Sequence, residues 1–545
     1  MSAALPAAEV FDYVIVGSGA AGAIVAARLA EDPSATVCVL EAGPRDWHPW
    51  LHLPAGFIKV VFNPRYAWQF STEPTHWTNG RRIPIPQGRT LGGSTAVNGL
   101  VYNRGLPSDY DGWAARGNPG WSFAEVLPYF QRTERRIGAA DEARAGRAGP
   151  LPVTTGDWIH PLDEAFLAGA GELGLPRNPD YNGATQAGVG YFQRTIHGGR
   201  RMSTATTFLH PALRQGDGLT VRTDARATRV VLQGTRATGV AYLQGGVERT
   251  VTARREVILA AGAINTPRLL QLSGIGPAAL LQAHGIAVRH HLPGVGENLK
   301  DHFSIRLVAS AKGTVTINEL ARFPRLAGQL AAWAMGRPNV LSLSPSVVHW
   351  FWQSRAGLAE PDLQGVFAPA SYRAGYVGQL DTFPGMTCGV WQHRPRSQGS
   401  VRIASADPLA DPLIQPNYLD DEEDRRVLLD GTRLARRLLQ TEALKPFVAA
   451  ETMPGVAVQR DDELLDYIRR FGVSSYHVNG TCRMGPAGDA GAVVDARLRV
   501  HGLQNLRIAD ASVMPDIPSA NTCAAAMMIG EKAADFIRAH EGPAP

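Results

Sequence analysis

The chain has 545 residues, a formal net charge of +5, 44% hydrophobic residues and 19% charged residues. This length allows a large buried core and several domains. The basic residues are scattered and form no block, which argues against a nucleic-acid partner. The four cysteines lack CxxC and zinc-ligand spacing, so we expect a reducing compartment, no disulfide framework and no metal. With no apolar stretch of membrane-helix length and no signal-peptide pattern, we expect a cytoplasmic protein without an integral membrane segment.

The first forty residues carry the most informative pattern. Apolar residues 13–16 predict a strand, residues 23–30 a helix, and residues 36–40 a second strand that ends at Glu41. The turn between the first strand and the helix consists of Gly17, Ser18, Gly19, Ala20, Ala21 and Gly22.

This arrangement is the dinucleotide-binding fingerprint in its full context. Gly17 allows the tight turn, Gly19 lets the backbone approach a pyrophosphate, and Gly22 lets the helix pack on the strand. The helix N-terminus offers unpaired N–H groups to the phosphates, and Glu41 can accept hydrogen bonds from ribose hydroxyls. The fingerprint alone leaves open whether the cofactor is NAD or a flavin dinucleotide.

The middle of the chain predicts further sheet and helix. A loop at 89–98 contains Gly92 and Gly93, which allow close backbone approach. Residues 162–173 favour a helix, and residues 219–259 alternate as antiparallel strands do. A buried strand at 256–261 leads to a helix that begins near Thr266-Pro267, with proline in its first turn.

The last half of the chain changes character. Aromatic-rich strands are predicted at 347–353 and 386–393, and polar helices at 420–441 and 460–471. A short strand at 506–509 precedes a C-terminal helix at 522–540.

Two polar residues near the C-terminal end stand out. His477 lies in a glycine-rich stretch, SSYHVNGTCRMG, although a single histidine is more often structural. Asp510 ends the short strand and could accept hydrogen bonds from a polyol chain, or could be a simple turn residue. The start of the C-terminal helix could stabilise negative charge on a cofactor ring.

Several segments together resemble one family, the glucose–methanol–choline (GMC) family of FAD-dependent oxidoreductases, in its choline dehydrogenase-like and alcohol dehydrogenase branch. The matching segments occur in the family's order, and they are the fingerprint with Glu41, RTLGGSTAVNGLVYNRG (89–105), AAGAINTPRLLQLSGIGP (260–277), LPGVGENLKDH (292–302), SYHVNGTCRMG (475–485) and LRIADASVMP with NT (506–522).

The resemblance implies a mixed α/β fold, with a Rossmann-like FAD-binding domain and an inserted antiparallel-sheet substrate-binding domain. We expect the FAD-binding domain at 8–150, 203–305 and 475–541, and the substrate-binding domain at 151–202 and 306–474.

The resemblance also implies site residues. His477 matches the family's invariant histidine, and Asn521 its histidine or asparagine partner. The cofactor-binding residues it implies, in addition to Gly17–Gly22 and Glu41, are Ala42, Trp68, Arg89, Leu91, Gly92, Gly93, Ser94, Asn98, Gly99, Val101, Val230, Ala261, Gly262, Tyr476, Asp510, Ala511, Asn521 and Thr522.

Two departures from the family sharpen the prediction. Some members attach FAD through a histidine in the GG-containing loop, where this chain has Val97, so we expect noncovalent FAD. Choline-using members carry a glutamate in the segment before the PDLQ motif, and here residues 341–353 contain no acid. The aromatic residues there favour an apolar or aromatic alcohol, unless they only pack the core. The substrate-pocket residues we predict are Val348, Trp350, Trp352, Phe367 and Trp391.

The resemblance therefore predicts oxidation of a primary alcohol to an aldehyde. His477 would remove the hydroxyl proton, and Asn521 would hold the same oxygen while hydride passes to flavin N5. The electron acceptor, O₂ or another compound, is open, and Ser475 tilts the choice slightly to a dehydrogenase. A flavin-containing lyase or light-driven decarboxylase on the same fold is the alternative, and the oligomeric state is open.

Overall fold

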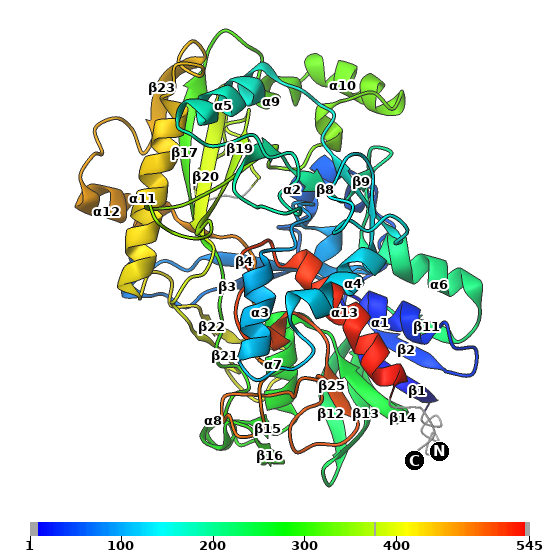
Figure 1. Cartoon of the computed structure of the whole chain (residues 1–545). Helices are drawn as coiled ribbons and strands as arrows, with labels where there is room; N and C mark the ends of the chain where they lie inside the picture. Colours follow the sequence, from blue (N-terminus) through cyan, green and yellow to red (C-terminus); the bar gives the residue numbers. More distant parts are fainter. Residues whose placement is uncertain (1–8, 375–377, 540–545) are drawn as a thin grey trace.

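The computed structural model describes residues 9–374 and 378–539, which form two large sheets with helices packed around them (Figure 1). The first sheet has the strand order β11-β2-β1-β14-β13-β12, and β25 pairs with the second half of β14. Its strands are β1 (Glu9–Val16), β2 (Val37–Leu40), β11 (Leu219–Arg222), β12 (Ala225–Gln233), β13 (Arg236–Gln244), β14 (Val247–Leu259) and β25 (Leu506–Ile508).

The first sheet is parallel at its centre and antiparallel at one edge. Strands β11, β2, β1, β14 and β25 run parallel, and β12, β13 and β14 pair antiparallel. The prediction that residues 219–259 are all antiparallel is therefore wrong for β11. This strand pairs with β2, far away in sequence, and alternation of side chains carries no information about strand direction.

Helices α1 (Gly22–Leu29) and α13 (Cys523–Arg538) pack together beside this sheet (Figure 1). A Cβ atom on Gly530 would lie 2.8 Å from the Cα of Ala21, so this contact needs a glycine. Arg28 donates two hydrogen bonds, of 2.8 and 2.9 Å, to the buried carboxylate of Glu531. The two ends of the sequence thus meet at the fingerprint helix.

Helix α7 (Gly262–Leu272) begins earlier than predicted. Pro267 lies inside it rather than in its first turn, because the carboxylate of Asp510 accepts a hydrogen bond from the Gly262 N–H and fixes the helix start there. Pro267 has no N–H for the carbonyl of Ala263. The hydroxyl of Thr481 donates to that carbonyl at 2.6 Å instead, so the interior proline leaves no unsatisfied acceptor there.

The second sheet is antiparallel, with the strand order β23-β17-β20-β19-β18-β7, and β24 also pairs with β17. Its strands are β7 (Gly188–Tyr191), β17 (Phe303–Ala311), β18 (Val348–Trp352), β19 (Leu363–Ala368), β20 (Gly385–Gln392), β23 (Val448–Met453) and β24 (Val473–Ser474).

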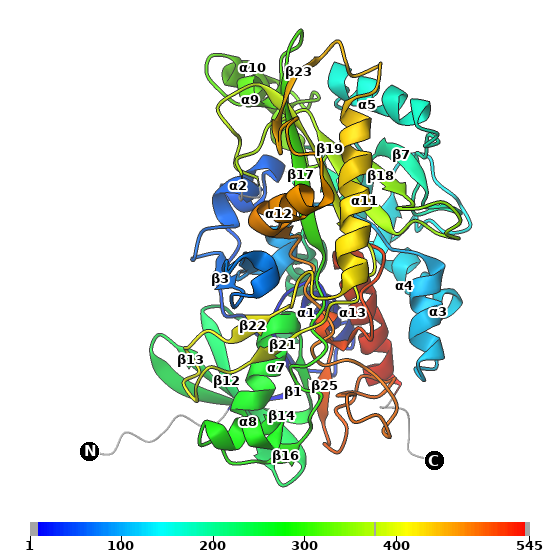
Figure 2. The same cartoon turned by 90° about the vertical axis from the view of Figure 1, so that its left-hand side faces the viewer.

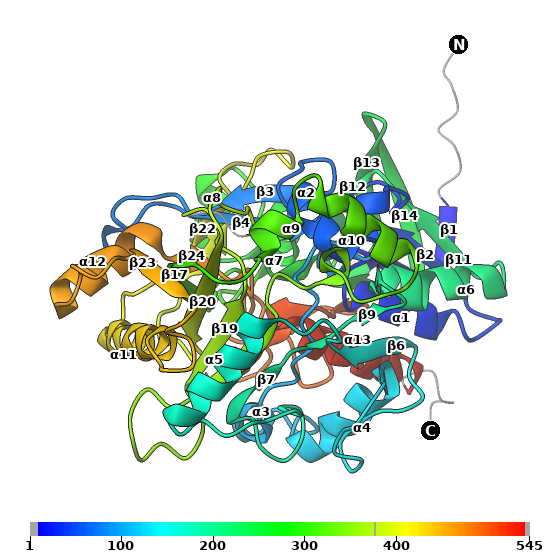
Figure 3. The same cartoon turned by 90° about the horizontal axis from the view of Figure 1, so that it is seen from above.

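Helices α5 (Pro161–Glu172) and α11 (Glu422–Leu439) cover one face of the second sheet (Figures 2 and 3). Their apolar side chains and those of this face form one buried cluster, in which Phe166 of α5 stacks on Phe367 with ring centroids 4.2 Å apart. The opposite face of the sheet is left for the cavity described below.

Shorter elements complete the fold. The remaining helices are α2 (Phe57–Val60), α3 (Pro107–Ala115), α4 (Phe123–Thr133), α6 (His210–Gln215), α8 (Ala278–Ala283), α9 (Ile317–Leu320), α10 (Arg325–Ala334) and α12 (Asp461–Phe471). The remaining strands are β3 (Ala67–Ser71), β4 (Pro84–Gly88), β5 (Glu134–Arg136), β6 (Leu151–Thr155), β8 (Gln193–Arg194), β9 (Ile196–His197), β10 (Arg200–Arg201), β15 (Ile275–Gly276), β16 (His290–His291), β21 (Ser400–Arg402) and β22 (Leu413–Gln415).

The division of the chain into the two predicted domains stays a prediction. Strands β21 and β22 lie within 306–474 but pack on α7 of the first sheet, where Gln271 donates to the Val401 carbonyl at 3.0 Å. Residue 8, residues 540–541 and the predicted helix end at His540 lie outside the described residues.

Candidate active site

A cavity of about 360 Å³ lies between the two sheets. One end, here called the cofactor end, is lined by the fingerprint turn, Glu41, and the segments at 225–227 and 260–265. The other end, here called the substrate end, is lined by second-sheet residues, namely Ser304, Arg306, Val366, Gly389 and Trp391. Three further segments lie along the wall between these ends: the glycine-rich loop at 89–98, residues 474–478, and the start of α13.

The backbone at the cofactor end is open because glycines meet there. Gly17 has φ of +99°, and a Cβ on it would lie 2.4 Å from the carbonyl oxygen of Ala260. Gly93 approaches the fingerprint closely, since its Cβ would lie 2.7 Å from the Cα of Gly19. A Cβ on Gly19 itself would meet no atom closer than 4.0 Å. The turn therefore leaves a groove along bare backbone, as a pyrophosphate requires.

Glu41 directly follows β2 and lines this groove. Its carboxylate accepts hydrogen bonds from the N–H and hydroxyl of Ser18, at 3.1 and 2.7 Å, and from the N–H of Gly43 at 2.9 Å. Burial raises the pKa of Glu41, and these hydrogen bonds oppose that shift. The carboxylate is thus fixed at the strand end, where the fingerprint needs an acceptor for a ribose.

Asp510 ties three segments together at the same end. Its carboxylate accepts from the N–H groups of Gly262 and Ser512, at 2.9 and 2.8 Å, and from the hydroxyl of Thr266 at 2.6 Å. Burial raises its pKa, against the effect of these bonds. Asp510 lines the cavity, and it also holds the start of α7 against β25.

Sequence reasoning did not single out two arginines that line this end, Arg226 and Arg268. Arg226, at the start of β12, lines the cavity, and its guanidinium lies 4.9 Å from the ring centre of Trp68. The guanidinium of Arg89 lies 4.7 Å from the same ring. An arginine in a strand of alternating residues belongs to no recognisable motif, so only the fold shows that Arg226 lines the cavity.

Most of the predicted cofactor residues line the cavity, and they are Gly17, Gly19, Ala20, Ala21, Glu41, Ala42, Trp68, Gly93, Ser94, Asn98, Gly99, Val101, Ala261, Gly262, Tyr476, Asp510, Ala511, Asn521 and Thr522. Six predicted residues do not line it, namely Ser18, Gly22, Arg89, Leu91, Gly92 and Val230. Ser18, Arg89 and Gly92 support the wall through hydrogen bonds. The apolar side chains of Leu91 and Val230 are buried in the cluster around the first sheet, so a cofactor contact of these two residues would have to come from their backbone.

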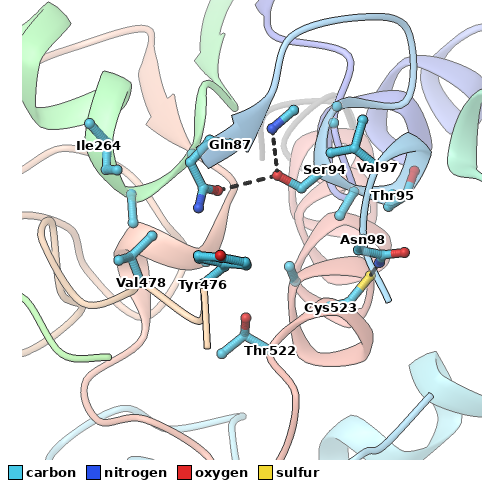
Figure 4. Close-up of a pocket in the computed structure, with 18 of the residues that line it drawn as sticks. Gln87, Ser94, Thr95, Val97, Asn98, Ile264, Tyr476, Val478, Thr522 and Cys523 are labelled. Carbon is cyan, nitrogen blue, oxygen red and sulfur yellow. Dashed lines mark hydrogen bonds between the residues drawn. The ribbon is translucent and has the colours of Figure 1, made fainter. Parts of the chain in front are cut away.

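Figure 4 shows the middle of the cavity, with Ser94, Val97 and Asn98 of the glycine-rich loop on one side and Tyr476 and Val478 on the other. The hydroxyl of Ser94 donates to the side-chain oxygen of Gln87 and accepts from the N–H of Gly88, at 3.2 and 3.0 Å. These bonds hold the loop against β4.

His477 is held in the wall by Asp301. The backbone N–H of His477 donates to the Asp301 carboxylate at 2.7 Å, and the hydroxyls of Ser474 and Tyr418 donate to the same carboxylate. Burial raises the pKa of Asp301 to about 6. Asp301 lies in the LKDH segment, one of the segments that carry the family resemblance. That membership was the one sequence feature that could have pointed to Asp301 as a site residue.

Both ring nitrogens of His477 have side-chain neighbours. Its Nδ1 lies 2.9 Å from Nδ1 of His302, and its Nε2 lies 3.1 Å from Nδ2 of Asn521. The side-chain oxygen of Asn521 in turn accepts from Nε2 of Gln364 at 3.0 Å. Burial, and secondly His302, lower the pKa of His477 well below the usual value, so the ring is neutral at pH 7. The two residues predicted to act together do lie within hydrogen-bond distance.

The predicted substrate pocket needs correction. Of its residues only Trp391 lines the cavity. Val348, Trp350 and Phe367 are buried in the cluster beneath α5 and α11, and Trp352 packs against that cluster. Side chains alternate between the faces of a strand, so Trp391 on β20 faces the cavity while these residues face the helices. The strand segments that carry these residues are apolar almost throughout. A continuous apolar run does not show which side chains face the cavity and which face the helices.

Within the described residues, no cluster of three or more metal-ligating side chains occurs, and no helix combines the length and apolarity needed to cross a bilayer. Cys38, Cys388, Cys482 and Cys523 are free thiols.

Comparisons with known proteins identify the family. The GMC oxidoreductase family models match residues 11–304 and 395–530, and the chain belongs to this family. It is 40% identical over 538 residues, 97% of this chain and 93% of the relative, to an oxygen-dependent choline dehydrogenase of Staphylococcus aureus.

Solved structures agree with this assignment. Pyridoxine 4-oxidase from Mesorbium loti has a TM-score of 0.88 and 30% identity over 97% of this chain and 100% of its own. Formate oxidase has a TM-score of 0.90 and 26% identity over 98% and 99%, and a fungal aryl-alcohol oxidase has 0.84 and 25% over 97% and 99%.

The protein is therefore an FAD-dependent GMC oxidoreductase that oxidises CH–OH groups of an alcohol-type substrate. The bare-backbone groove and the fixed Glu41 carboxylate fit FAD at the cofactor end, and the start of α13 fits it from the wall between the two ends. The predicted fold class, a parallel-core FAD sheet with an antiparallel substrate-domain sheet, is confirmed.

Proposed function

We propose that this enzyme oxidises a primary alcohol to the aldehyde, with His477 as the base. The observation that carries the proposal is the 3.1 Å pairing of His477 Nε2 with the amide of Asn521 in the cavity wall. A neutral imidazole can take the hydroxyl proton, and the uncharged amide can hold the same oxygen and orient the carbon. When bound, the flavin of FAD supplies the acceptor for the hydride.

An uncharged or apolar alcohol fits the substrate end better than choline. The carboxylates among the described lining residues, Glu41 and Asp510, both lie at the cofactor end. The substrate end instead carries Arg306, together with Val366 and Trp391. A quaternary ammonium group would meet a cation there, although Trp391 could still offer a cation–π contact. This composition supports an apolar or aromatic alcohol, in contrast to the substrate named for the choline dehydrogenase relative.

Noncovalent FAD is part of the proposal. Val97 lines the cavity, and its side chain has no nucleophilic atom that could bond to a flavin. We expect acid or heat denaturation to release all of the flavin into the supernatant, and flavin that stays with the precipitated chain would contradict this.

The test of the reaction is an anaerobic screen of aliphatic, aromatic and amino alcohols, with bleaching of the yellow flavin as the signal. We expect benzyl-type alcohols to bleach it and choline to do so poorly. If no alcohol bleached the flavin, the lyase or decarboxylase alternative would be favoured.

Admission of air then identifies the electron acceptor, because rapid return of colour indicates an oxidase and slow return a dehydrogenase. Ser475 slightly favours the dehydrogenase. The cytoplasmic location remains a prediction.

A further inference from the structure

His302 is a buried histidine that contacts the proposed base directly. It immediately precedes β17, and its two ring nitrogens have one neighbour each. Nε2 lies 2.7 Å from the backbone carbonyl oxygen of His393, and Nδ1 lies 2.9 Å from Nδ1 of His477. The two rings are nearly perpendicular, at 88°.

The carbonyl oxygen of His393 determines which atom donates in each hydrogen bond that links His393, His302 and His477. A carbonyl can only accept, so Nε2 of His302 carries a hydrogen and donates. In a neutral imidazole the other nitrogen then has a lone pair, so Nδ1 of His302 accepts from Nδ1–H of His477. His477 therefore has its own lone pair on Nε2, the atom next to Asn521.

The opposite end of the network agrees with this direction. Nε2 of Gln364 donates to the side-chain oxygen of Asn521, which leaves the NH₂ group of Asn521 to donate to His477 Nε2. His302 stays neutral, because burial lowers its pKa to about 4, so it remains an acceptor at neutral pH.

We propose that His302 is a positioning residue that keeps the proton of His477 on Nδ1, so that Nε2 is free to take the proton of the alcohol. This inference depends on the proposed function, since it concerns the base of that reaction. Without an acceptor at Nδ1, the ring could carry its hydrogen on Nε2, where it cannot accept the substrate proton. The ring could also rotate away from Asn521.

The kinetic test compares His302→Leu with His302→Asn in the FAD-loaded enzyme. Leucine offers no acceptor, whereas the asparagine oxygen can occupy the place of Nδ1. We expect the anaerobic rate constant of flavin reduction to fall about 100-fold in His302→Leu and at most about tenfold in His302→Asn, with alcohol affinity changed little. His349→Leu is the matched control, because His349 is equally buried but its ring packs against Tyr181 and Phe192 rather than against His477.

Equal losses in His302→Leu, His302→Asn and His349→Leu would overturn the inference, as would a wild-type rate in His302→Leu. The proposed function can fail separately, since no alcohol would then reduce the flavin of the unmodified enzyme.

A second measurement does not depend on the folding of a His302 variant. In the wild-type holoenzyme with ¹⁵N-labelled histidine, the signals of His477, identified by their loss in His477→Gln, report which ring nitrogen carries hydrogen. A protonated Nδ1 and an unprotonated Nε2 are expected at neutral pH. The reverse assignment would overturn the inference even if His302→Leu did not fold.

Discussion

The two ends of the cavity are built in different ways. The cofactor end consists of bare backbone and of loops that follow strands, and its carboxylates are fixed by backbone N–H groups, as at Glu41 and Asp510. The substrate end consists of side chains that project from one face of an antiparallel sheet, such as Arg306 and Trp391. Recognition by backbone leaves a sequence motif, whereas recognition by strand side chains depends on which face each residue occupies.

The largest effect is expected at the cofactor end from Gly19→Val. The Cβ of residue 19 would lie 4.0 Å from its nearest neighbour, so the protein has room for it, and the branched side chain would occupy the groove. We expect a folded protein with FAD affinity reduced by at least about 100-fold. Flavin content after gel filtration and the thermal midpoint measure this. Gly112→Val in α3, where a Cβ also meets nothing, is the control and should retain FAD.

The next effect is expected where the two ends meet, from His477→Ala. FAD should remain bound, and the rate constant of flavin reduction by alcohol should fall by about 10² to 10⁴, the usual range for a lost general base. Anaerobic stopped-flow absorbance checks the rate, and the flavin spectrum checks the cofactor. Reduction at the wild-type rate would mean that another group is the base.

A pair of tryptophans on the two faces of the second sheet tests the comparison itself. Trp350→Leu should destabilise the protein by about 2–4 kcal/mol with little change in preference among alcohols, because Trp350 is buried beneath the helices. Trp391→Leu should change kcat/KM ratios between aromatic and aliphatic alcohols by about tenfold with a smaller loss of stability. Urea denaturation and steady-state kinetics distinguish them, and the opposite pattern would reverse the assignment of the faces.

The smallest effect is a displaced pH profile. Burial lowers the pKa of His477, and lowering the pKa of a base extends its unprotonated range to more acidic pH. The acid limb of kcat/KM should therefore lie below pH 6.5, with full activity from pH 8 down to about 6.5. A loss of activity centred above pH 7 would contradict a neutral, desolvated His477.

The sequence predicted the parts of the site that depend on local chain geometry. The fingerprint glycines and Glu41 lie where the patterns indicated, and His477 and Asn521 lie together as the family resemblance implied. Arg226, Asp301 and His302 were missed as functional side chains, because their partners come from distant segments. The start of α7 was misplaced, because Asp510 binds the N–H of Gly262 and Thr481 binds the carbonyl of Ala263. Both partners are distant in sequence from Thr266-Pro267, on which the prediction was based.

The sequence by itself determined the dinucleotide-binding turn, because glycine loops and strand ends impose their geometry within a few residues. Its resemblance to the GMC family, carried by motifs spread along the chain, supplied the flavin cofactor and the proposed catalytic pair. The tertiary structure alone decided which strand side chains face the substrate end. Trp350 and Trp391 look equivalent in the sequence, and only the packing of α5 and α11 on one face of the sheet buries the first and leaves the second at the cavity. The pairing of β24 with β17 brings His302 to His477 across 175 residues of chain, a contact that no local pattern contains.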